Sequence, residues 1–235
     1  MKVLCACEES QAVCIAFREK GHEAYSCDLE PCSGGHPEWH TQQDVLPLLN
    51  GYCEFVTVDG KWHSIHSEWD MIIAFPPCTY LSNAGACRLY PQKGKLDQAR
   101  FKKGLEAKAF FMKFYNADCP RIAIENPISS TVFEMPEHTQ TIQPYEYESQ
   151  DDGIFHPYTK ATRLWLKGLR PLTPTSPNTR PIGPYVPAGT SRKNNAKYGA
   201  AKRGEDAKNR AKTFQGIARA MAAQWGSQEA AHDER

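Results

Sequence analysis

Residues 1–28, MKVLCACEESQAVCIAFREKGHEAYSCD, contain the pattern that decides the fold. The apolar run at 2–6 predicts a short buried strand. Residues 11–20 place three apolar side chains on one helical face, and Gly21 ends that helix. A second strand is expected at 23–27. A strand, a helix and a second strand in this order predict a parallel sheet.

The rest of the chain extends this unit into a doubly wound α/β domain. The continuous apolar run at 70–75 predicts a central strand that is buried on both faces. Residues 54–58 fit either a sheet strand or part of an inserted hairpin that turns at Asp59-Gly60. Further strands are expected at 120–125 and 163–166, and helices at 96–115 and 213–225. We therefore expect a mostly parallel sheet whose ligands bind beyond the carboxyl ends of its strands.

The composition is that of a globular protein. Of 235 residues, 40% are hydrophobic and 23% charged, which excludes collagen, coiled coil and wholesale disorder. The apolar runs are far shorter than the roughly 18 residues of a membrane span, and the N-terminus resembles no signal peptide, so a cytoplasmic location without membrane contact is expected. Nine cysteines without a C-x-x-C spacing predict reduced thiols. Cys32, His36 and His40, with His63 and His66 further on, could form a metal site, but the same residues are more often found in loops and on the surface, and we expect no metal.

Charge is distributed unevenly along the chain. Residues 1–159 carry 13 Lys+Arg and 22 Asp+Glu, whereas residues 160–213 carry 13 and 2. The basic segment favours a polyanionic partner, nucleic acid first, although a solvated tail would have the same composition. The predicted division is a catalytic core at 1–166, a proline-rich basic appendage at 167–212, a helix at 213–226 that packs back on the core, and a frayed tail at 227–235.

Two neighbouring strand ends carry reactive side chains. The strand at 70–75 runs through Pro76-Pro77 into Cys78, and the strand at 120–125 ends at Glu125. A thiolate is a nucleophile, and a desolvated, protonated glutamate can donate a hydrogen bond to a ring nitrogen. Together they are suited to attack on carbon 6 of a pyrimidine. A lone cysteine here would more often be structural, so the pairing with Glu125 carries the prediction.

These motifs resemble those of the DNA cytosine-5 methyltransferases, and are closest to a compact branch found in phages and prophages. AFPPCTYLSNAG at 74–85 matches the family's Pro-Cys loop, and Glu125-Asn126-Pro127 matches its Glu-Asn-Val. The resemblance implies that Cys78 is the nucleophile, that Glu125 binds the base and that Asn126 shapes the loop behind it. Of the family's Gln-x-Arg-x-Arg segment, only Arg163 is present here, and Lys160 could substitute for one of the other residues. The resemblance implies that Arg163, together with Lys160, orients the target ring or the cysteine loop.

The resemblance also implies S-adenosylmethionine as the cofactor, with Asp28 holding its ribose and Asp44 its adenine. The cofactor-contacting residues it implies are Cys7, Glu8, Glu9, Ser10, Asp28, Leu29, Asp44, Val45 and Pro76. The first loop, Ala6 to Ser10, departs from the family because it contains no glycine. We expect a carboxylate of this loop to pair with the cofactor's amino group and Ser10 to cap the next helix.

DNA is the partner implied. Because little chain is left for a recognition domain, we expect either a short recognition sequence or a partner protein for target recognition. Phosphate contacts are expected from Lys160, Arg192, Lys193, Lys197, Lys202 and Arg203. A role in restriction and modification follows from the same resemblance. Two alternatives stay open: another pyrimidine carbon-5 enzyme with a different one-carbon donor or a nucleotide substrate, and a catalytically degenerate DNA-binding decoy or regulator.

Overall fold

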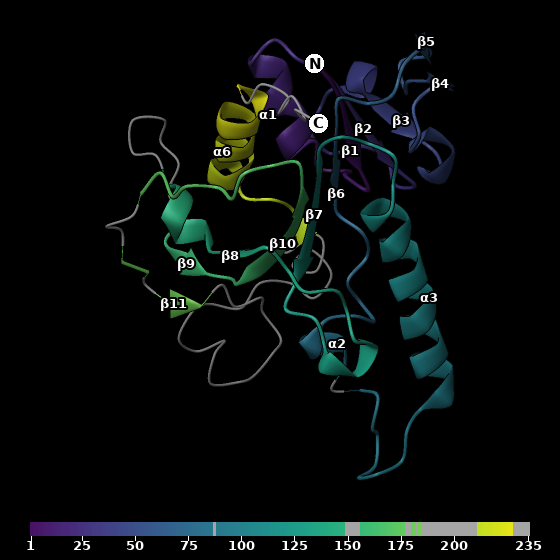
Figure 1. The fold of residues 1–235 in the computed structure, drawn as a ribbon, viewed down its shortest axis with the longest axis vertical. Helices are drawn as coiled ribbons and strands as arrows, with labels where there is room; N and C mark the ends of the chain where they lie inside the picture. The colour runs from purple at the N-terminus through teal and green to yellow at the C-terminus, as the bar shows by residue number, and fades with distance from the viewer. Residues whose placement is uncertain (87, 149–155, 177–179, 182, 185–210, 228–235) are drawn as a thin grey trace, which may run out of the picture.

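A seven-stranded mixed sheet forms the centre of the computed structural model, with the strand order β3-β2-β1-β6-β7-β10-β8 (Figure 1). The structure describes residues 1–86, 88–148, 156–176, 180–181, 183–184 and 211–227. The strands are β1 (Lys2–Ala6), β2 (Glu23–Asp28), β3 (His40–Gln42), β6 (Met71–Ala74), β7 (Ile122–Pro127), β8 (Gln140–Ile142) and β10 (Thr162–Lys167).

The strands from β3 to β7 in this order are all parallel, while β10 runs antiparallel to both β7 and β8. The first unit is β1, then α1 (Ala12–Glu19), then β2. The predicted α/β class with a mostly parallel sheet is therefore confirmed. The apolar run at 70–75 became the strand β6, whose four residues are all buried and which pairs with β1 and β7.

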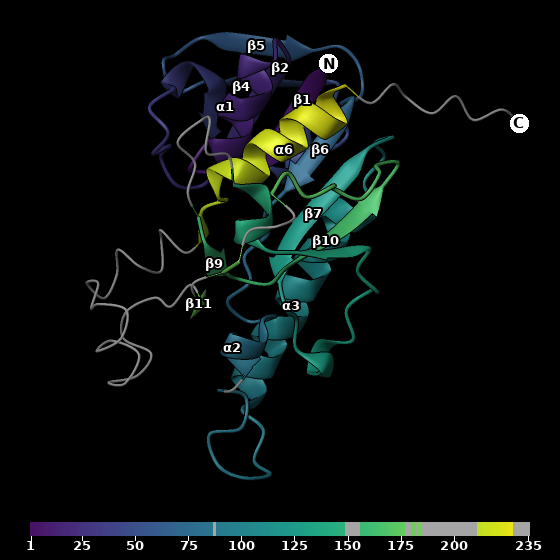
Figure 2. The same cartoon turned by 90° about the vertical axis from the view of Figure 1, so that its left-hand side faces the viewer.

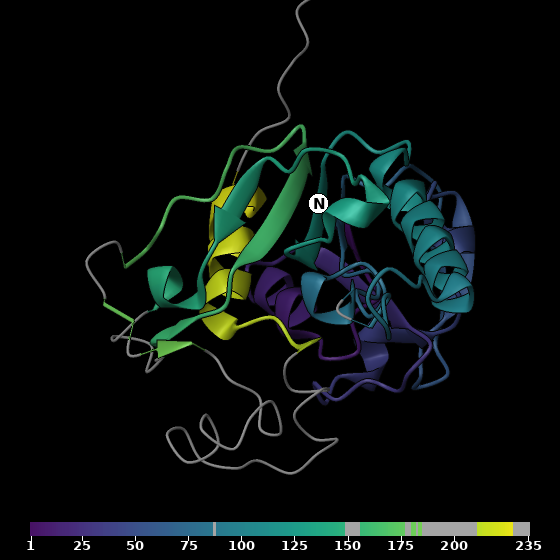
Figure 3. The same ribbon diagram turned by 90° about the horizontal axis from the view of Figure 1, so that it is seen from below.

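Helices cover both faces of the sheet (Figure 3). On one face, α1 and α6 (Gln215–Gly226) pack together, and Phe17 of α1 and Met221 of α6 are fully buried in one apolar cluster. On the other face lies α3 (Gln98–Tyr115), which contributes Phe111 and Phe114 to a second cluster. Both predicted long helices are present. The contact of α6 with α1 returns the end of the described chain to the helix that follows β1.

The segment at 54–58 belongs to an inserted hairpin, which decides between the two interpretations of it. β4 (Cys53–Val56) pairs antiparallel with β5 (Trp62–Ile65). The hairpin attaches to β3 because Val58 N donates to His40 O at 2.8 Å and Thr41 Oγ1 donates to Val56 O at 2.9 Å.

Short elements complete the described fold. They are α2 (Asn83–Ala86), β9 (Tyr158–Thr159), β11 (Gly183–Pro184), and the 3-10 turns η1 (Pro37–Trp39), η2 (Leu46–Leu48), η3 (Thr131–Phe133) and η4 (Pro144–Tyr147). β9 pairs in parallel with β11. Within the described residues, no helix combines the length and apolar character that a membrane crossing requires.

After β10 the chain packs on the core in an extended conformation. Leu172 is buried and exchanges two hydrogen bonds with the side chain of Gln140. Thr173 exchanges two more with the side chain of Gln224 in α6. The first part of the proline-rich segment is thus attached to both β8 and the last helix. The predicted domain division stays a prediction.

Candidate functional site

The Cys78 turn and Glu125 leave the sheet at neighbouring positions of the same edge. β6 and β7 are adjacent and parallel, with Ile73 opposite Ala123 and Ala74 opposite Ile124. Because parallel strands end on the same side, the residues that follow Ala74 come out beside Glu125. Figure 2 shows β6 and β7 next to each other. Cys78 is partly exposed rather than sealed in the interior. The two side chains that the sequence singled out therefore share one end of the sheet.

Asn126 joins these two strand ends directly. Its side chain is fully buried, and Nδ2 donates to the carbonyl oxygen of Pro76 at 3.0 Å. Pro76 is itself buried. The other side-chain atom, Oδ1, is buried and has no hydrogen-bond partner among the described residues. Asn126 thus fixes the backbone two residues before Cys78.

The turn after Cys78 is bonded to the segment after Glu125. Cys78 O accepts from Leu81 N at 3.1 Å and from Ser82 N at 3.0 Å. Ser130 N donates to Leu81 O at 2.8 Å, and Asn83 N donates to Ile128 O at 2.9 Å. These bonds make the two loops a single backbone-linked unit, so the position of Cys78 depends on the end of β7.

Glu125 lies in an environment that favours its neutral form. Burial raises the pKa of its carboxyl group, and the nearby Lys160 ammonium and a hydrogen bond with Thr162 act in the opposite direction. Lys160 Nζ also lies 5.3 Å from the ring centre of Phe214. The structure thus places Lys160, which the sequence assigned to DNA, beside Glu125. Arg163 is paired across the strands with Asn126, at the same edge.

The first loop adopts a glycine-like backbone without glycine. Cys7 and Gln11 have φ of 58° and 59°, in the left-handed region that non-glycine residues rarely occupy. Glu8 N donates to Cys27 O at 3.2 Å, which attaches the loop to the end of β2. Ser33 N donates to Glu9 O at 2.8 Å, so the segment after β2 lies against the same loop.

Glu8, rather than Ser10 alone, bonds backbone amides in the first turn of α1, which corrects the expected division of roles, in which Ser10 caps this helix and a carboxylate of the loop binds the cofactor. Its side chain is 3% exposed, and its oxygens accept from Val13 N at 2.6 Å and Cys14 N at 3.2 Å. Glu8 therefore satisfies the amides at the start of α1, while the Ser10 hydroxyl lies 3.5 Å from Ala12 N. Burial raises the Glu8 pKa to about 7, against the effect of the two backbone hydrogen bonds. Both of its oxygens are occupied by the helix rather than turned toward a ligand.

Asp28, Asp44 and Cys7 lie close to one another at the ends of the first three sheet strands. Burial is the main cause that raises the Cys7 pKa, and the charges of Asp28 and Asp44 raise it further. Asp28 is partly buried, which raises its own pKa, and its Oδ1 accepts from Glu30 N at 2.9 Å. Asp44 is exposed. The two aspartates expected to hold a nucleoside thus border one region.

The other residues of the predicted cofactor set differ in their environment. Leu29 is 72% exposed, whereas Val45 is 3% exposed and belongs to the apolar core. Glu9 and Ser10 are partly buried. Between β3 and Asp44, the side-chain nitrogen of Gln43 is buried with no hydrogen-bond partner in the described part of the chain. Gln43 is a candidate ligand residue that the sequence did not single out.

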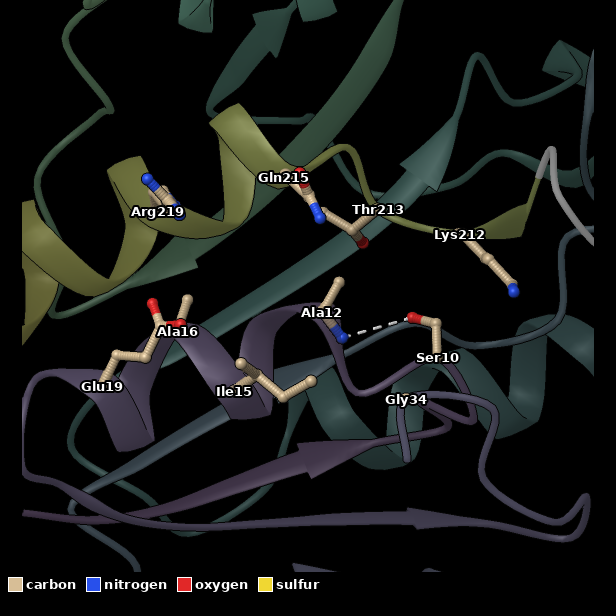
Figure 4. A pocket seen from close by; sticks show the side chains of 10 residues that line it. All are labelled: Ser10, Ala12, Ile15, Ala16, Glu19, Gly34, Lys212, Thr213, Gln215 and Arg219. Carbon is tan, nitrogen blue, oxygen red and sulfur yellow. Dashed lines mark hydrogen bonds between the residues drawn. The ribbon is translucent and has the colours of Figure 1, made fainter. Parts of the chain in front are cut away.

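A groove of about 310 Å³ lies between α1 and α6, and one end of it reaches Ser10 of the first loop (Figure 4). Its lining residues are Ser10, Ala12, Ile15, Ala16, Glu19, Gly34, Lys212, Thr213, Gln215 and Arg219. Ala12 and Gln215 are the first residues of α1 and α6, so the positive ends of two helices adjoin it. Thr213 and Gln215 were missed from the sequence, where the only signal was their place at the start of a helix predicted to return to the core.

In the described residues, no group of three or more His, Cys, Asp or Glu side chains is arranged to hold a metal ion. His36 Nδ1 lies 2.9 Å from Glu38 Oε1, and His40 Nδ1 lies 2.9 Å from Ser26 Oγ. Arg192, Lys193, Lys197, Lys202 and Arg203, expected to contact DNA, lie outside the described residues.

The comparisons with known proteins give a distant similarity of fold. No protein-family model and no curated protein matches the chain. One similar solved structure is that of a proposed DNA modification methyltransferase encoded within a prophage (E. coli), with 11% identity and a TM-score of 0.36. The match covers 71% of this chain and 46% of the other, so this chain spans about half the length of that protein. The resemblance to cytosine-5 methyltransferases stays a prediction.

Proposed function

We propose that this chain is a methyltransferase that acts on carbon 5 of cytosine in DNA and uses S-adenosylmethionine as the methyl donor. The observation that carries the proposal is the shared sheet edge: the Cys78 turn and Glu125 leave adjacent parallel strands, and Asn126 joins them through Pro76. A nucleophile and a hydrogen-bond donor so placed can act on one pyrimidine ring.

The proposed reaction begins at the Cys78 sulfur. The thiolate forms a bond to carbon 6, and the displaced π electrons make carbon 5 nucleophilic. When bound, S-adenosylmethionine would supply an electrophilic methyl group to carbon 5, and its sulfonium would leave as a neutral thioether. A base, taken to be water, then removes the proton from carbon 5, the double bond between carbons 5 and 6 re-forms, and the bond from sulfur to carbon 6 breaks to release the thiolate. Cysteine is regenerated, so it acts catalytically.

Glu125 holds the ring at nitrogen 3 in this proposal. A neutral carboxyl group can donate a hydrogen bond to that nitrogen, and a carboxylate cannot. Burial, which raises the Glu125 pKa, favours the donor form. Electron density reaches nitrogen 3 as the sulfur adds, so the interaction strengthens in the transition state. Lys160 and Arg163, at the same edge, would orient the ring or the cysteine turn.

The residues at the ends of β1, β2 and β3 fit the proposed cofactor. Carboxylates accept hydrogen bonds from ribose hydroxyls, and Asp28 places a partly buried carboxyl group at the end of β2. The buried Gln43 nitrogen without a partner supplies a donor in the same region. In the groove, Ser10, Thr213 and Gln215 offer polar groups beside two helix starts, which suits the carboxylate of an amino-acid moiety.

Trapping on a fluorinated base tests the nucleophile, the substrate class and the reaction together. Fluorine on carbon 5 cannot leave as a cation, so an adduct that has received a methyl group cannot collapse. We expect the chain, mixed with S-adenosylmethionine and duplex DNA containing 5-fluorocytosine, to form a covalent complex through Cys78. Mass spectrometry of the peptide would locate the bond.

The matched control is Cys32, whose side chain is partly exposed like that of Cys78. The C32S variant should form the complex and the C78S variant should not. Absence of a complex with C32S and wild-type chain, while calorimetry shows S-adenosylmethionine bound, would refute the proposed chemistry. Absence of S-adenosylmethionine binding would instead favour a pyrimidine enzyme with another donor.

A further inference from the structure

We propose that residues 88–103, which follow the Cys78 turn, form a DNA-binding surface that holds the phosphate backbone of the duplex next to Cys78. The basic segment at 160–213 would then be only one of two cationic surfaces. The placement of this surface beside a reacting base depends on the proposed function, but its affinity for DNA can be measured without any reaction.

The charge of the chain before residue 160 is strongly segregated. Residues 79–115 contain eight Lys+Arg and two Asp+Glu, although the flanking regions are acidic. Residues 1–78 contain four Lys+Arg and 12 Asp+Glu, and residues 116–159 contain one and eight. The cations of the core are therefore concentrated in the segment that begins directly after Cys78. Such a local excess beside acidic surroundings would direct a polyanion to this place.

The centre of this surface is a projecting loop with a fixed base. Asp97 N donates to Leu89 O at 2.8 Å, and the Leu89 side chain is buried in the core. Lys95 N donates to Gln92 O at 3.0 Å, and Gly94, with φ of 75°, makes the turn at the tip. Figures 1 and 2 show the chain between α2 and α3 reaching away from the sheet. The loop thus presents its side chains beyond the body of the protein.

The cations of this surface are available to a ligand. Arg88, Lys93, Lys95, Lys102 and Lys103 are all exposed, and none makes an ion pair with a described residue. Lys103 is exposed even though its Nζ lies 5.7 Å from the ring centre of Tyr80.

Asp97 is the single carboxylate within residues 79–103, and it neutralises only part of the positive charge of this surface. Asp97 accepts from Arg100 N at 3.0 Å and so caps the start of α3. Its charge is directed at the helix amides rather than at the tip of the loop. Lysines on a flexible stem, such as Lys93 and Lys95 near the tip of the loop, are suited to phosphate contacts that position DNA without reading its sequence.

Arg100 connects this surface to the turn that carries Cys78. Its guanidinium donates to Gly85 O at 3.0 Å and to Thr79 O at 3.5 Å, and it lies 5.0 Å from the ring centre of Tyr80. The start of α3 is therefore fixed against the residues that directly follow Cys78. A duplex bound along the loop would lie beside the nucleophile.

The test compares two double variants of the full chain. K93Q/K95Q removes the two tip cations, and K20Q/K113Q removes two exposed cations elsewhere, with the same change in net charge. Binding of a fluorescein-labelled 20-base-pair duplex is followed by anisotropy at several salt concentrations. Each phosphate contact contributes a slope of about 0.9 in log K against log salt, which is roughly eightfold in affinity between 1 M and 0.1 M salt.

For K93Q/K95Q we expect the salt slope to fall by about 2 and Kd at 0.1 M salt to rise by about tenfold to sixtyfold. The control variant should stay within about threefold of the wild-type Kd. Equal slopes and equal affinities in the two double variants would overturn the inference, as would a preference of the tip for single strands that leaves duplex affinity unchanged.

Trapping on 5-fluorocytosine DNA separates this inference from the proposed function. Loss of duplex affinity in K93Q/K95Q, with no Cys78 adduct in the wild-type chain, would support the surface and refute the chemistry. A Cys78 adduct in the wild-type chain, with normal duplex binding by K93Q/K95Q, would support the chemistry and refute the surface. A wild-type chain that binds no duplex at all would refute both.

Discussion

Asn126→Asp tests the link between the two strand ends with the smallest possible change. Aspartate keeps the shape of asparagine and keeps its buried oxygen Oδ1, but it replaces the donor Nδ2 with an oxygen. In the wild-type chain Nδ2 donates to Pro76 O at 3.0 Å from a fully buried side chain. The variant therefore removes one hydrogen bond and, when ionised, places a buried charge against a carbonyl oxygen.

The expected cost depends on pH. A buried charge without a partner costs about 3–5 kcal/mol, and the unsatisfied Pro76 carbonyl is part of that cost. A protonated aspartate can donate its O–H to Pro76 O and restore the bond. The folded state of the variant thus binds this proton more tightly than the unfolded state, so burial raises the pKa of the new carboxyl group. Stability must then fall as pH rises, by at most about 1.4 kcal/mol per pH unit.

Denaturant unfolding at pH 5 and pH 8, followed by tryptophan fluorescence, measures this difference. Asn126→Asp should lose about 3–5 kcal/mol relative to wild type at pH 8 and recover most of that loss at pH 5. The exposed Asn50→Asp should change stability by less than about 0.5 kcal/mol at both values. An Asn126→Asp chain as stable as wild type at pH 8, or equally destabilised at both values, would refute the proposed link.

Three further predictions use other side chains. Glu125→Gln should slow adduct formation on 5-fluorocytosine DNA. In the wild type the single-turnover rate should decline as pH rises and Glu125 loses its proton, and in Glu125→Gln this decline should be absent. Burial raises the pKa of Glu8 to about 7 in the folded chain, against an ordinary value of 4.5. Between pH 4.5 and pH 7 the free energy of unfolding of the wild type should therefore fall by about 3 kcal/mol more than that of Glu8→Gln, as measured by denaturant unfolding. Equal pH dependence in the two chains would contradict this. Gly104→Ala would place a Cβ 2.1 Å from Phe133 Cζ and should cost about 1–3 kcal/mol in a thermal melt, whereas an unchanged Tm would mean that Phe133 moves freely.

The fold could be predicted from the sequence wherever burial leaves a strong local pattern. The apolar run at 70–75 predicted the central strand because a strand covered on both faces has no polar side. β8 and β9 were missed because they are three and two residues long, and β8 is a sheet edge held by pairing with β10 rather than by its own composition. Such strands depend on partners that are distant in sequence.

The candidate site was predictable in its residue types but not in its internal contacts. The placement of the Cys78 turn and Glu125 at one edge of the sheet needed only the rule that parallel strands end on the same side. The capping role of Glu8 was missed because the choice between two polar residues near a helix start depends on backbone direction, and Gln11 begins α1 in a left-handed conformation that the sequence does not predict. The position of Lys160 beside Glu125 likewise depends on a contact between residues that are distant in sequence.

The glycine-free first loop illustrates how one structural requirement can be met at another position. Left-handed backbone at Cys7 and Gln11 costs on the order of 1 kcal/mol each, and Gln11 opposes that cost by bonding its side chain to both backbone groups of His36, at 2.8 and 3.1 Å. The close approach that a glycine permits occurs at Gly34, where a Cβ would lie 2.6 Å from Gln11 Cβ and 2.7 Å from Ser10 O. The neighbouring segment supplies the small residue, and the first loop keeps its tight path. The absence of glycine from that loop therefore does not exclude the tight backbone path, and it does not count against the proposed cofactor site.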